Sequence, residues 1–286
     1  MIYEFLAKAI GSLGAVHARQ LAAVALNVAG KVSSAQPSLS LARHVMGLAF
    51  PSPLGLAAGF DKHGKYFMLL PPIGFGFAEI GSVTPLPEAE RSVGLHAVSL
   101  NLSRYRLPHP IPLGVSISMN RSTPPAAMVH DYLKCFLSVQ HVADYVTLNL
   151  GPRAGPDLHL PENTKVLQEI FHAIKQAQEA LSVTNDKRLP VVVKVDQARG
   201  NTDALIDCVL EYGFDGIVLS GSTACLAQVA NDLNGQIPII SVGGIRTAQE
   251  AKERLDAGAS LLQIYSGLVA SGPKLLRQMN EQLSAS

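Results

Sequence analysis

Two apolar runs near the end of the chain, each ending abruptly in glycine, limit the fold more than any other feature. They are residues 238–245 (PIISVGGI) and 261–267 (LLQIYSG), and a stretch of helical character follows each one. In a parallel α/β protein this pattern predicts a strand that leaves its sheet and turns into a helix. Glycine has no Cβ atom, so backbone N–H groups there can face an anion. Two such units in succession are typical of the loops after strands seven and eight of a β/α barrel, which form a phosphate-binding cup.

Earlier apolar runs complete a set of eight strands. We expect strands at residues 53–59, 78–84, 114–118, 145–150, 191–195 and 216–221. Helical patterns separate most of them, notably over residues 163–181, 203–212 and 248–257. Strands that alternate with helices imply a parallel sheet, and eight of them imply that the sheet closes. The predicted fold class is α/β, with a (β/α)8 TIM barrel over residues 41–286.

Length and composition suit one barrel and exclude several classes of protein. The chain has 286 residues, 48% of them hydrophobic and 16% charged, with a formal net charge of +1. Such a balance favours a filled globular core and gives no reason to expect a nucleic-acid partner. Three widely spaced cysteines, no apolar run of about 18 residues and no signal-peptide pattern together predict a cytoplasmic protein. The nine histidines show no metal-ligand spacing, so no metal site is expected.

A short helical extension is expected before the barrel, over residues 1–40. Apolar residues recur at helical spacing up to Leu13, Gly14 interrupts them, and a second amphipathic stretch covers residues 17–28. Two such helices could cap the base of the barrel or lie on a membrane surface. Few basic residues are present, so electrostatic support for membrane binding is small. Peripheral contact with the inner membrane through residues 1–30 stays open.

The crossover between residues 84 and 114 departs from the alternation. Its five prolines are Pro85, Pro87, Pro108, Pro110 and Pro112. Since proline disrupts a helix interior, we expect no helix here, although residues 97–102 form a short apolar piece. A long irregular loop on the functional face of a barrel predicts a cover over the substrate.

Lys194 lies in mid-strand among valines. A buried ammonium group needs an anionic partner. That partner could be a carboxylate on a neighbouring strand or an anionic ligand at the barrel mouth, where a cation would also stabilise a reduced flavin.

Other polar side chains stand where the expected strands end. Lys62 follows the first strand and Asn149 ends the fourth, at the edge of a barrel where catalytic groups gather. Serines at the ends of the second, third and sixth strands could line a planar polar cofactor together: Ser82, Ser116 and Ser220.

Four segments resemble signatures of the dihydroorotate dehydrogenase family, in its quinone-dependent class. They are residues 55–62 (GLAAGFDK), 74–85 (GFGFAEIGSVTP), 242–245 (VGGI) and 257–267 (AGASLLQIYSG). Residues 1–5 and 17–19 are similar to the N-terminal helical module of that class. The resemblance spans nearly the whole chain. It implies an oxidoreductase on a TIM barrel, with a quinone or another electron acceptor as partner.

The resemblance also implies FMN as the cofactor. Its phosphate would lie on Gly243, Gly244, Tyr265, Ser266 and Gly267. Its ring system would lie near Ala57, Ala58, Gly59, Ser82, Ser116, Asn149, Lys194, Ser220 and Gly221. Lys62 matches a lysine that helps to bind the substrate in the family.

The substrate half departs from the family's pattern. After the fourth strand the family has a serine-rich run whose second serine is the catalytic base, whereas residues 149–156 read NLGPRAGP and hold no hydroxyl or thiol. Asparagines of the family fall at Ser116, Ala154 and Gly221. The asparagine-rich segment that contacts orotate is missing from the crossover. A polar substrate that loses hydrogen bonds binds more weakly, so we expect weak binding of orotate. The sequence thus keeps the residues that match the family's FMN site and has lost most of those that match its orotate site.

These observations favour an FMN-dependent oxidoreductase that acts on a small substrate other than orotate. Its candidate catalytic residues are Lys62, Asn149 and Arg153; further acid/base candidates on the covering segments are Tyr105, His96 and His159. Three alternatives stay open. They are a genuine dihydroorotate dehydrogenase of pyrimidine biosynthesis with a rearranged base, a lyase with Lys62 or Lys194 as a Schiff-base nucleophile, and a non-catalytic flavin-binding protein.

Overall fold

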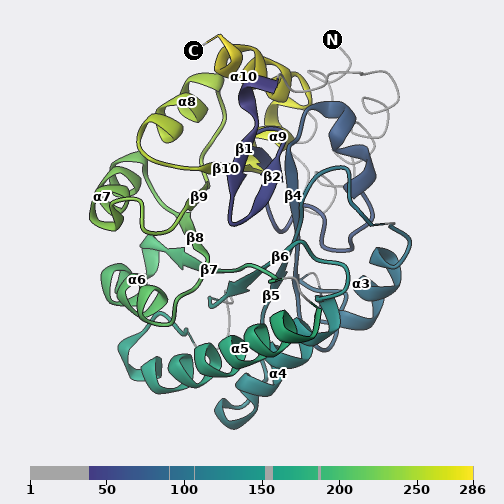
Figure 1. Cartoon of the computed structure of the whole chain (residues 1–286), viewed down its shortest axis with the longest axis vertical. Coiled ribbons are helices and arrows are strands. Elements are labelled where there is room, and N and C mark those ends of the chain that lie inside the picture. Colours follow the sequence, from purple (N-terminus) through teal and green to yellow (C-terminus); the bar gives the residue numbers. More distant parts are fainter. Residues whose placement is uncertain (1–38, 90, 106, 152–156, 186–187, 286) are drawn as a thin grey trace.

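Eight parallel strands close into a barrel in the computed structural model, which describes residues 39–89, 91–105, 107–151, 157–185 and 188–285 (Figure 1). Their hydrogen-bonded order is β10–β3–β4–β5–β6–β7–β8–β9, and β10 pairs with β3. They are β3 (Leu54–Leu56), β4 (Phe77–Val83), β5 (Leu113–Ile117), β6 (Tyr145–Asn149), β7 (Val191–Asp196), β8 (Gly216–Ser220), β9 (Ile239–Val242) and β10 (Leu261–Ile264). Each overlaps a run predicted as a strand, so the predicted (β/α)8 barrel is confirmed.

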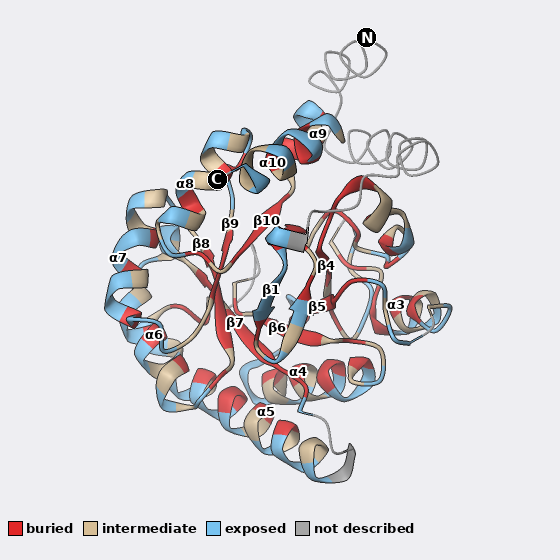
Figure 2. Ribbon diagram, turned by 45° about the horizontal axis from the view of Figure 1, so that its top comes forward, coloured by how far each residue is buried: buried red, intermediate tan, exposed pale blue. Residues whose placement is uncertain are grey.

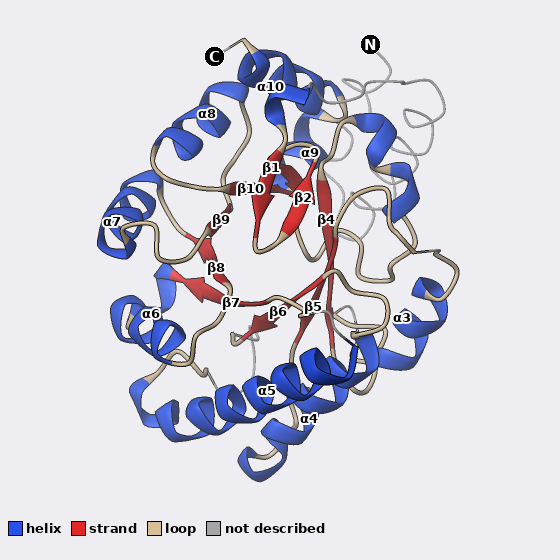
Figure 3. Cartoon of the chain, in the orientation of Figure 1, coloured by secondary structure: helices blue, strands red, loops and turns tan. Residues whose placement is uncertain are grey.

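Helices surround the strands with their buried faces inward and their exposed faces outward (Figures 2 and 3). They are α3 (Leu95–Leu102), α4 (Pro125–Val139), α5 (Thr164–Asn185), α6 (Thr202–Glu211), α7 (Thr223–Leu233), α8 (Ala248–Asp256), α9 (Ser266–Ser271) and α10 (Lys274–Ser284). The helices predicted over residues 163–181, 203–212 and 248–257 correspond to α5, α6 and α8. At the start of α8, Thr247 and Glu250 each bind the other's backbone N–H in a capping box, which fixes where this helix begins.

Helix α3 contradicts the prediction that the crossover between residues 84 and 114 holds no helix. The prolines of this segment all lie outside residues 95–102, so none interrupts the helical hydrogen bonds. Leu95, Val98 and Leu102 recur at helical spacing and are buried on one face. The density of prolines on both sides concealed a short amphipathic helix.

A two-stranded antiparallel hairpin, β1 (Arg43–Val45) and β2 (Leu48–Phe50), lies across one end of the barrel. Its buried residues Val45 and Phe50 form one cluster with residues near the N-terminal ends of the barrel strands, including Phe77 and Tyr145. Phe50 meets Phe77 edge to face at 5.3 Å between ring centroids. This end of the barrel is therefore closed by apolar packing.

Gly114 on β5 packs directly against the ring of Tyr145, so this position has no room for a larger residue. A Cβ atom on Gly114 would lie 2.1 Å from Tyr145 Cζ, and Tyr145 is fully buried with its hydroxyl 3.2 Å from Glu79 Oε2. We expect Gly114→Ala to lower the free energy of unfolding by about 3 kcal/mol through overpacking. Urea denaturation followed by circular dichroism measures this loss.

Gly235→Ala is the control for that substitution. No atom lies within 4 Å of a Cβ on Gly235, whose φ is +76°, so only the left-handed backbone opposes alanine, at a cost of about 1 kcal/mol. Equal losses in the two variants would show that the contact with Tyr145 relaxes without cost.

The helical extension predicted over residues 1–40 lies almost entirely outside the described residues, and its boundary stays a prediction. Within the described ranges, no helix is both long and apolar enough to cross a bilayer.

Candidate functional site

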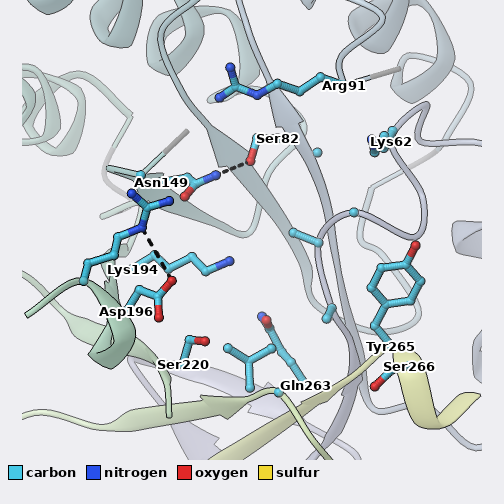
Figure 4. Close-up of a pocket in the computed structure, with 18 of the residues that line it drawn as sticks. Lys62, Ser82, Arg91, Asn149, Lys194, Asp196, Ser220, Gln263, Tyr265 and Ser266 are labelled. Atoms are coloured by element: carbon cyan, nitrogen blue, oxygen red, sulfur yellow. Dashed lines mark hydrogen bonds and ion pairs between the residues drawn. The ribbon is translucent and has the colours of Figure 1, made fainter. Parts of the chain in front are cut away.

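A cavity of about 690 Å³ opens at the C-terminal ends of the barrel strands (Figure 4). This volume is within the usual range for small-molecule and cofactor sites. Most of the residues predicted from the sequence line it together: Ala57, Ala58, Gly59, Lys62, Ser82, Asn149, Lys194, Ser220, Gly243, Gly244, Tyr265 and Ser266.

Three of the described site residues that the sequence predicted are not part of this wall. Arg153 lies outside the described residues, so its place is not tested. Gly221 lines a neighbouring hollow with Gly243 and Gly244. A Cβ on Gly267 would lie 2.2 Å from the carbonyl oxygen of Ile245, so Gly267 permits close backbone packing. Ser116 is 1% exposed and lies behind the wall.

The predicted phosphate cup has an open backbone. Gly243 and Gly244 have φ values of +98° and +74°, a conformation that glycine adopts without strain. Cβ atoms built on them would have no neighbour nearer than 3.7 Å. The cup therefore leaves room for a ligand to approach the main chain.

Arg254 on α8 lies behind this cup and was not foreseen from the sequence. Its guanidinium donates to Ser241 Oγ at 2.7 Å and to the Gly221 carbonyl at 3.0 Å, and Nη2 is the atom 3.7 Å from the Cβ position of Gly244. Burial lowers the pKa of the Arg254 guanidinium, although Glu250 opposes the shift. Arginine is always charged in proteins, so it adds positive potential behind the cup.

A chain of neutral hydrogen bonds fixes the polar groups at the ends of β4, β5 and β6. The Asn149 amide donates to Ser82 Oγ at 2.6 Å, and Ser82 Oγ lies 3.1 Å from Ser116 Oγ. Figure 4 shows the Asn149–Ser82 bond facing the cavity. Ser116 thus acts through Ser82. The backbone carbonyl of Asn149 accepts from the Tyr132 hydroxyl at 2.8 Å, whereas its side-chain oxygen Oδ1 can meet a ligand, because none of the described residues donates to that atom.

Lys194 projects from β7 into the cavity (Figure 4). No described carboxylate lies within ion-pair distance of its ammonium group. Its charge acts on Glu79 on β4, whose Oε2 accepts from Gln263 at 2.7 Å and Thr147 at 2.8 Å. Burial raises the pKa of the Glu79 carboxyl, although those hydrogen bonds and the charge of Lys194 oppose the rise. The charge of Lys194 therefore stabilises the Glu79 carboxylate from a distance, while its N–H donors face the cavity.

A second group of cations lies away from the phosphate cup. Arg91 and Lys62 stand on the opposite side of the cavity from Ser220 (Figure 4). Glu88 holds Arg91 at 2.9 Å, and lies 3.9 Å from Arg121, which also lines the cavity. Neither arginine was predicted, because both lie in loops, where the sequence has no period that indicates the direction of a side chain.

Among the described acid/base candidates from the sequence, His159 alone lines the cavity. His96 is exposed on α3. The Tyr105 hydroxyl donates to the Gly64 carbonyl at 2.8 Å, and burial, with the charge of Asp61, raises its pKa to about 12. His159 is 2% exposed and bound to Asp157.

The comparisons with known proteins agree with this architecture. The family model described as dihydroorotate dehydrogenase matches residues 40–91 and 218–286. Two similar proteins are both described as dihydroorotate dehydrogenase (quinone). The one from Methylobacillus flagellatus is 33% identical, over 82% of this chain and 84% of the relative. The one from Stutzerimonas stutzeri is 34% identical, over 87% of each.

A solved structure shows the same fold. The crystal structure of DHODH from Eimeria tenella in complex with ferulenol superimposes with a TM-score of 0.81 at 24% identity, covering 94% of this chain and 90% of that one. With relatives above 30% identity over most of their length and a closed barrel of the same architecture, this chain belongs to the dihydroorotate dehydrogenase family.

Proposed function

We propose that this protein is an FMN-dependent oxidoreductase that acts on a small anionic substrate other than dihydroorotate, with a quinone or another acceptor as electron partner. The observation that carries the proposal is the single cavity in which an open glycine cup, the Ser82–Asn149 pair and Lys194 meet. When bound, FMN would supply a two-electron acceptor for a substrate hydride.

The described residues fit FMN in size, shape and charge. Gly243 and Gly244, with Tyr265 and Ser266 beside them, would hold the phosphate, since no Cβ atom obstructs the backbone there. Ala57, Ala58 and Gly59 present little side chain and would allow a flat ring to lie against β3. Lys194 would stabilise negative charge on the pyrimidine end of the ring.

The charges of the wall favour an anionic substrate next to the cofactor. Asp196 is the one carboxylate among the described lining residues, against the cations Lys62, Arg91, Lys194, Arg121 and Arg199. Arg91 and Lys62 lie on the same side of the cavity as Ser82 (Figure 4). We assign Lys62 to binding an anionic or carbonyl group of the substrate.

A substrate other than dihydroorotate is supported by where the family pattern is lost. The family model leaves residues 92–217 unmatched, and this stretch holds β5, β6, β7 and their loops. Ser116, at the place of a family asparagine, is buried behind Ser82 and does not reach the cavity. The hydrogen bond that the family's asparagine would offer to orotate is therefore absent from the described wall.

One observation favours the second candidate, a genuine dihydroorotate dehydrogenase with a rearranged base. His159 follows β6 in the same loop as the missing serine and lines the cavity. A histidine in that position could accept the proton that serine accepts in the family.

Anaerobic titration of the purified full chain tests both candidates. We expect a flavin absorption band with about one FMN per chain, bleached by dithionite and restored by a soluble quinone. Dihydroorotate is expected to leave the band unchanged. Bleaching by dihydroorotate would establish the second candidate, and a preparation that neither retains nor takes up FMN would defeat both.

We also propose that the protein works in the cytoplasm with residues 1–30 as a peripheral contact to the inner membrane. This rests on the quinone-dependent relatives and the amphipathic pattern of those residues.

A further inference from the structure

The loop after β6 places a buried histidine in the cavity wall with one ring nitrogen unused. His159 Nδ1 lies 2.9 Å from Asp157 Oδ1. Its Nε2 atom is buried and has no hydrogen-bond partner among the described residues. Because the ionised Asp157 can only accept, Nδ1 carries the ring proton and Nε2 keeps a lone pair. A neutral imidazole in this state is a proton acceptor.

Both carboxylate oxygens of Asp157 accept hydrogen bonds, and these bonds fix the orientation of the His159 ring. Its Oδ1 also accepts from the backbone N–H of His159 at 3.1 Å, and its Oδ2 accepts from Arg199 Nη1 at 2.5 Å. Burial alone would raise the pKa of Asp157, but these hydrogen bonds and the charge of Arg199 lower it below its usual range. The carboxylate therefore stays ionised and stabilises a positive charge on the ring.

The backbone around the pair is also anchored. Asn163 donates to the Asp157 carbonyl at 2.8 Å, and Asn201 donates to the His159 carbonyl at 3.1 Å. A Cβ atom on Gly151 would lie 3.1 Å from His159 Cε1, the ring carbon bonded to Nε2. Gly151 follows Asn149 by two residues and lines the same cavity. The Cε1 edge of the imidazole thus adjoins Gly151 in the wall of the cavity.

We infer that His159 is the acid/base of the reaction and that Asp157 is its positioning residue, an assignment that rests on the proposed function. In the oxidative direction, His159 Nε2 accepts the proton of a substrate C–H next to a carbonyl. Bound FMN would supply the two-electron acceptor for the hydride of the adjacent carbon, so that the substrate would gain a C=C bond. The imidazolium then releases its proton to solvent, and the reverse direction returns it.

Other charged groups face this pair from the neighbouring elements. Arg199, which bonds to Asp157, also lies 3.6 Å from Asp196 at the end of β7. Lys194 and Lys62 line the same cavity. The His159 ring thus lies between one carboxylate that accepts from Arg199 and a cavity wall that carries two lysines.

Nitrogen-15 NMR of histidine-labelled holoprotein tests the assignment without any substrate. The His159 signal, identified by its loss in His159→Gln, is expected as the Nδ1–H tautomer at neutral pH. Asp157→Asn is expected to shift the tautomer, because the amide can donate as well as accept. A ring that carries its proton on Nε2 in the wild-type protein would overturn the assignment.

Kinetics give the second measurement. Reduction of bound FMN by any compound that bleaches the wild-type flavin is expected to slow by about 100- to 10,000-fold in His159→Gln, the range for loss of an acid/base. FMN content and reduction by dithionite should not change. His172→Gln, on the exposed face of α5, is the matched control with wild-type rates.

The outcomes separate this inference from the proposed function. A wild-type protein without FMN would defeat the proposed function, and with it the acid/base role. FMN retained and reduced equally fast in wild type and His159→Gln would defeat the acid/base assignment alone. If no compound bleaches the wild-type flavin, the tautomer seen by NMR decides the assignment.

Discussion

Replacing Gly244 by aspartate is expected to abolish retention of FMN while the barrel stays folded. The new carboxylate would stand in the cup where the phosphate is expected, and like charges in contact cost several kcal/mol, or on the order of a thousandfold in Kd. It would also lie near Arg254 Nη2, which is 3.7 Å from the Cβ position, and would pair with the cation behind the cup. Fluorescence quenching of free FMN by the apoprotein measures the change in Kd.

Gly235→Asp is the matched control for this prediction. Gly235 has a φ of +76°, against +74° for Gly244, and no atom lies within 4 Å of its Cβ position. Both variants therefore introduce the same charge and a similar backbone strain of about 1 kcal/mol. Because Gly235 lies in the loop between α7 and β9, away from the cavity, its variant should bind FMN as wild type does. If Gly244→Asp also binds FMN within threefold of wild type, the phosphate does not lie in this cup.

The barrel could be predicted because its signals are local. Each strand is a short apolar run, and glycines end several of them. The observed β9 ends at Val242, before the predicted end at residue 245, since the positive φ values of Gly243 and Gly244 take the chain out of the sheet. Gly243 and Gly244 therefore helped to predict the strand and are also the reason that it ends before residue 245.

The site was harder to predict because side-chain direction depends on register. Ser116 ends an apolar run as Ser82 and Ser220 do, yet β5 turns it toward Ser82 and away from the cavity. Arg254 gives no local signal on the charged helix α8, because only the packing of α8 against β9 brings it to Ser241. The Asp157–His159 spacing was visible in the sequence, whereas the buried and unbonded Nε2 atom was not.

Replacing Lys194 by methionine is expected to lower the midpoint potential of the bound flavin by about 60 mV, or roughly 3 kcal/mol for two electrons. The reason is that this ammonium group faces the cavity and is paired with none of the described carboxylates, so its charge is available to a reduced ring. Flavin reduction should slow by about 100-fold. Dye-coupled potentiometry of the holoprotein measures the potential, with Lys165→Met on the exposed face of α5 as the control. An unchanged potential in Lys194→Met with FMN still bound would remove Lys194 from the site.

A second effect of this substitution concerns Glu79 and can be separated from the first. Without the charge of Lys194, the pKa of the buried Glu79 carboxyl rises further. When the folded state raises the pKa of a carboxyl, the protein loses stability as the pH rises above the pKa of that carboxyl in the unfolded chain. The free energy of unfolding of Lys194→Met should therefore fall progressively from about pH 4.5 upward. Adding Glu79→Gln should recover that stability, because the uncompensated carboxylate is gone, and should leave the potential low. If Glu79→Gln restored both the stability and the midpoint potential, Lys194 would act by stabilising the Glu79 carboxylate and not by stabilising the reduced flavin.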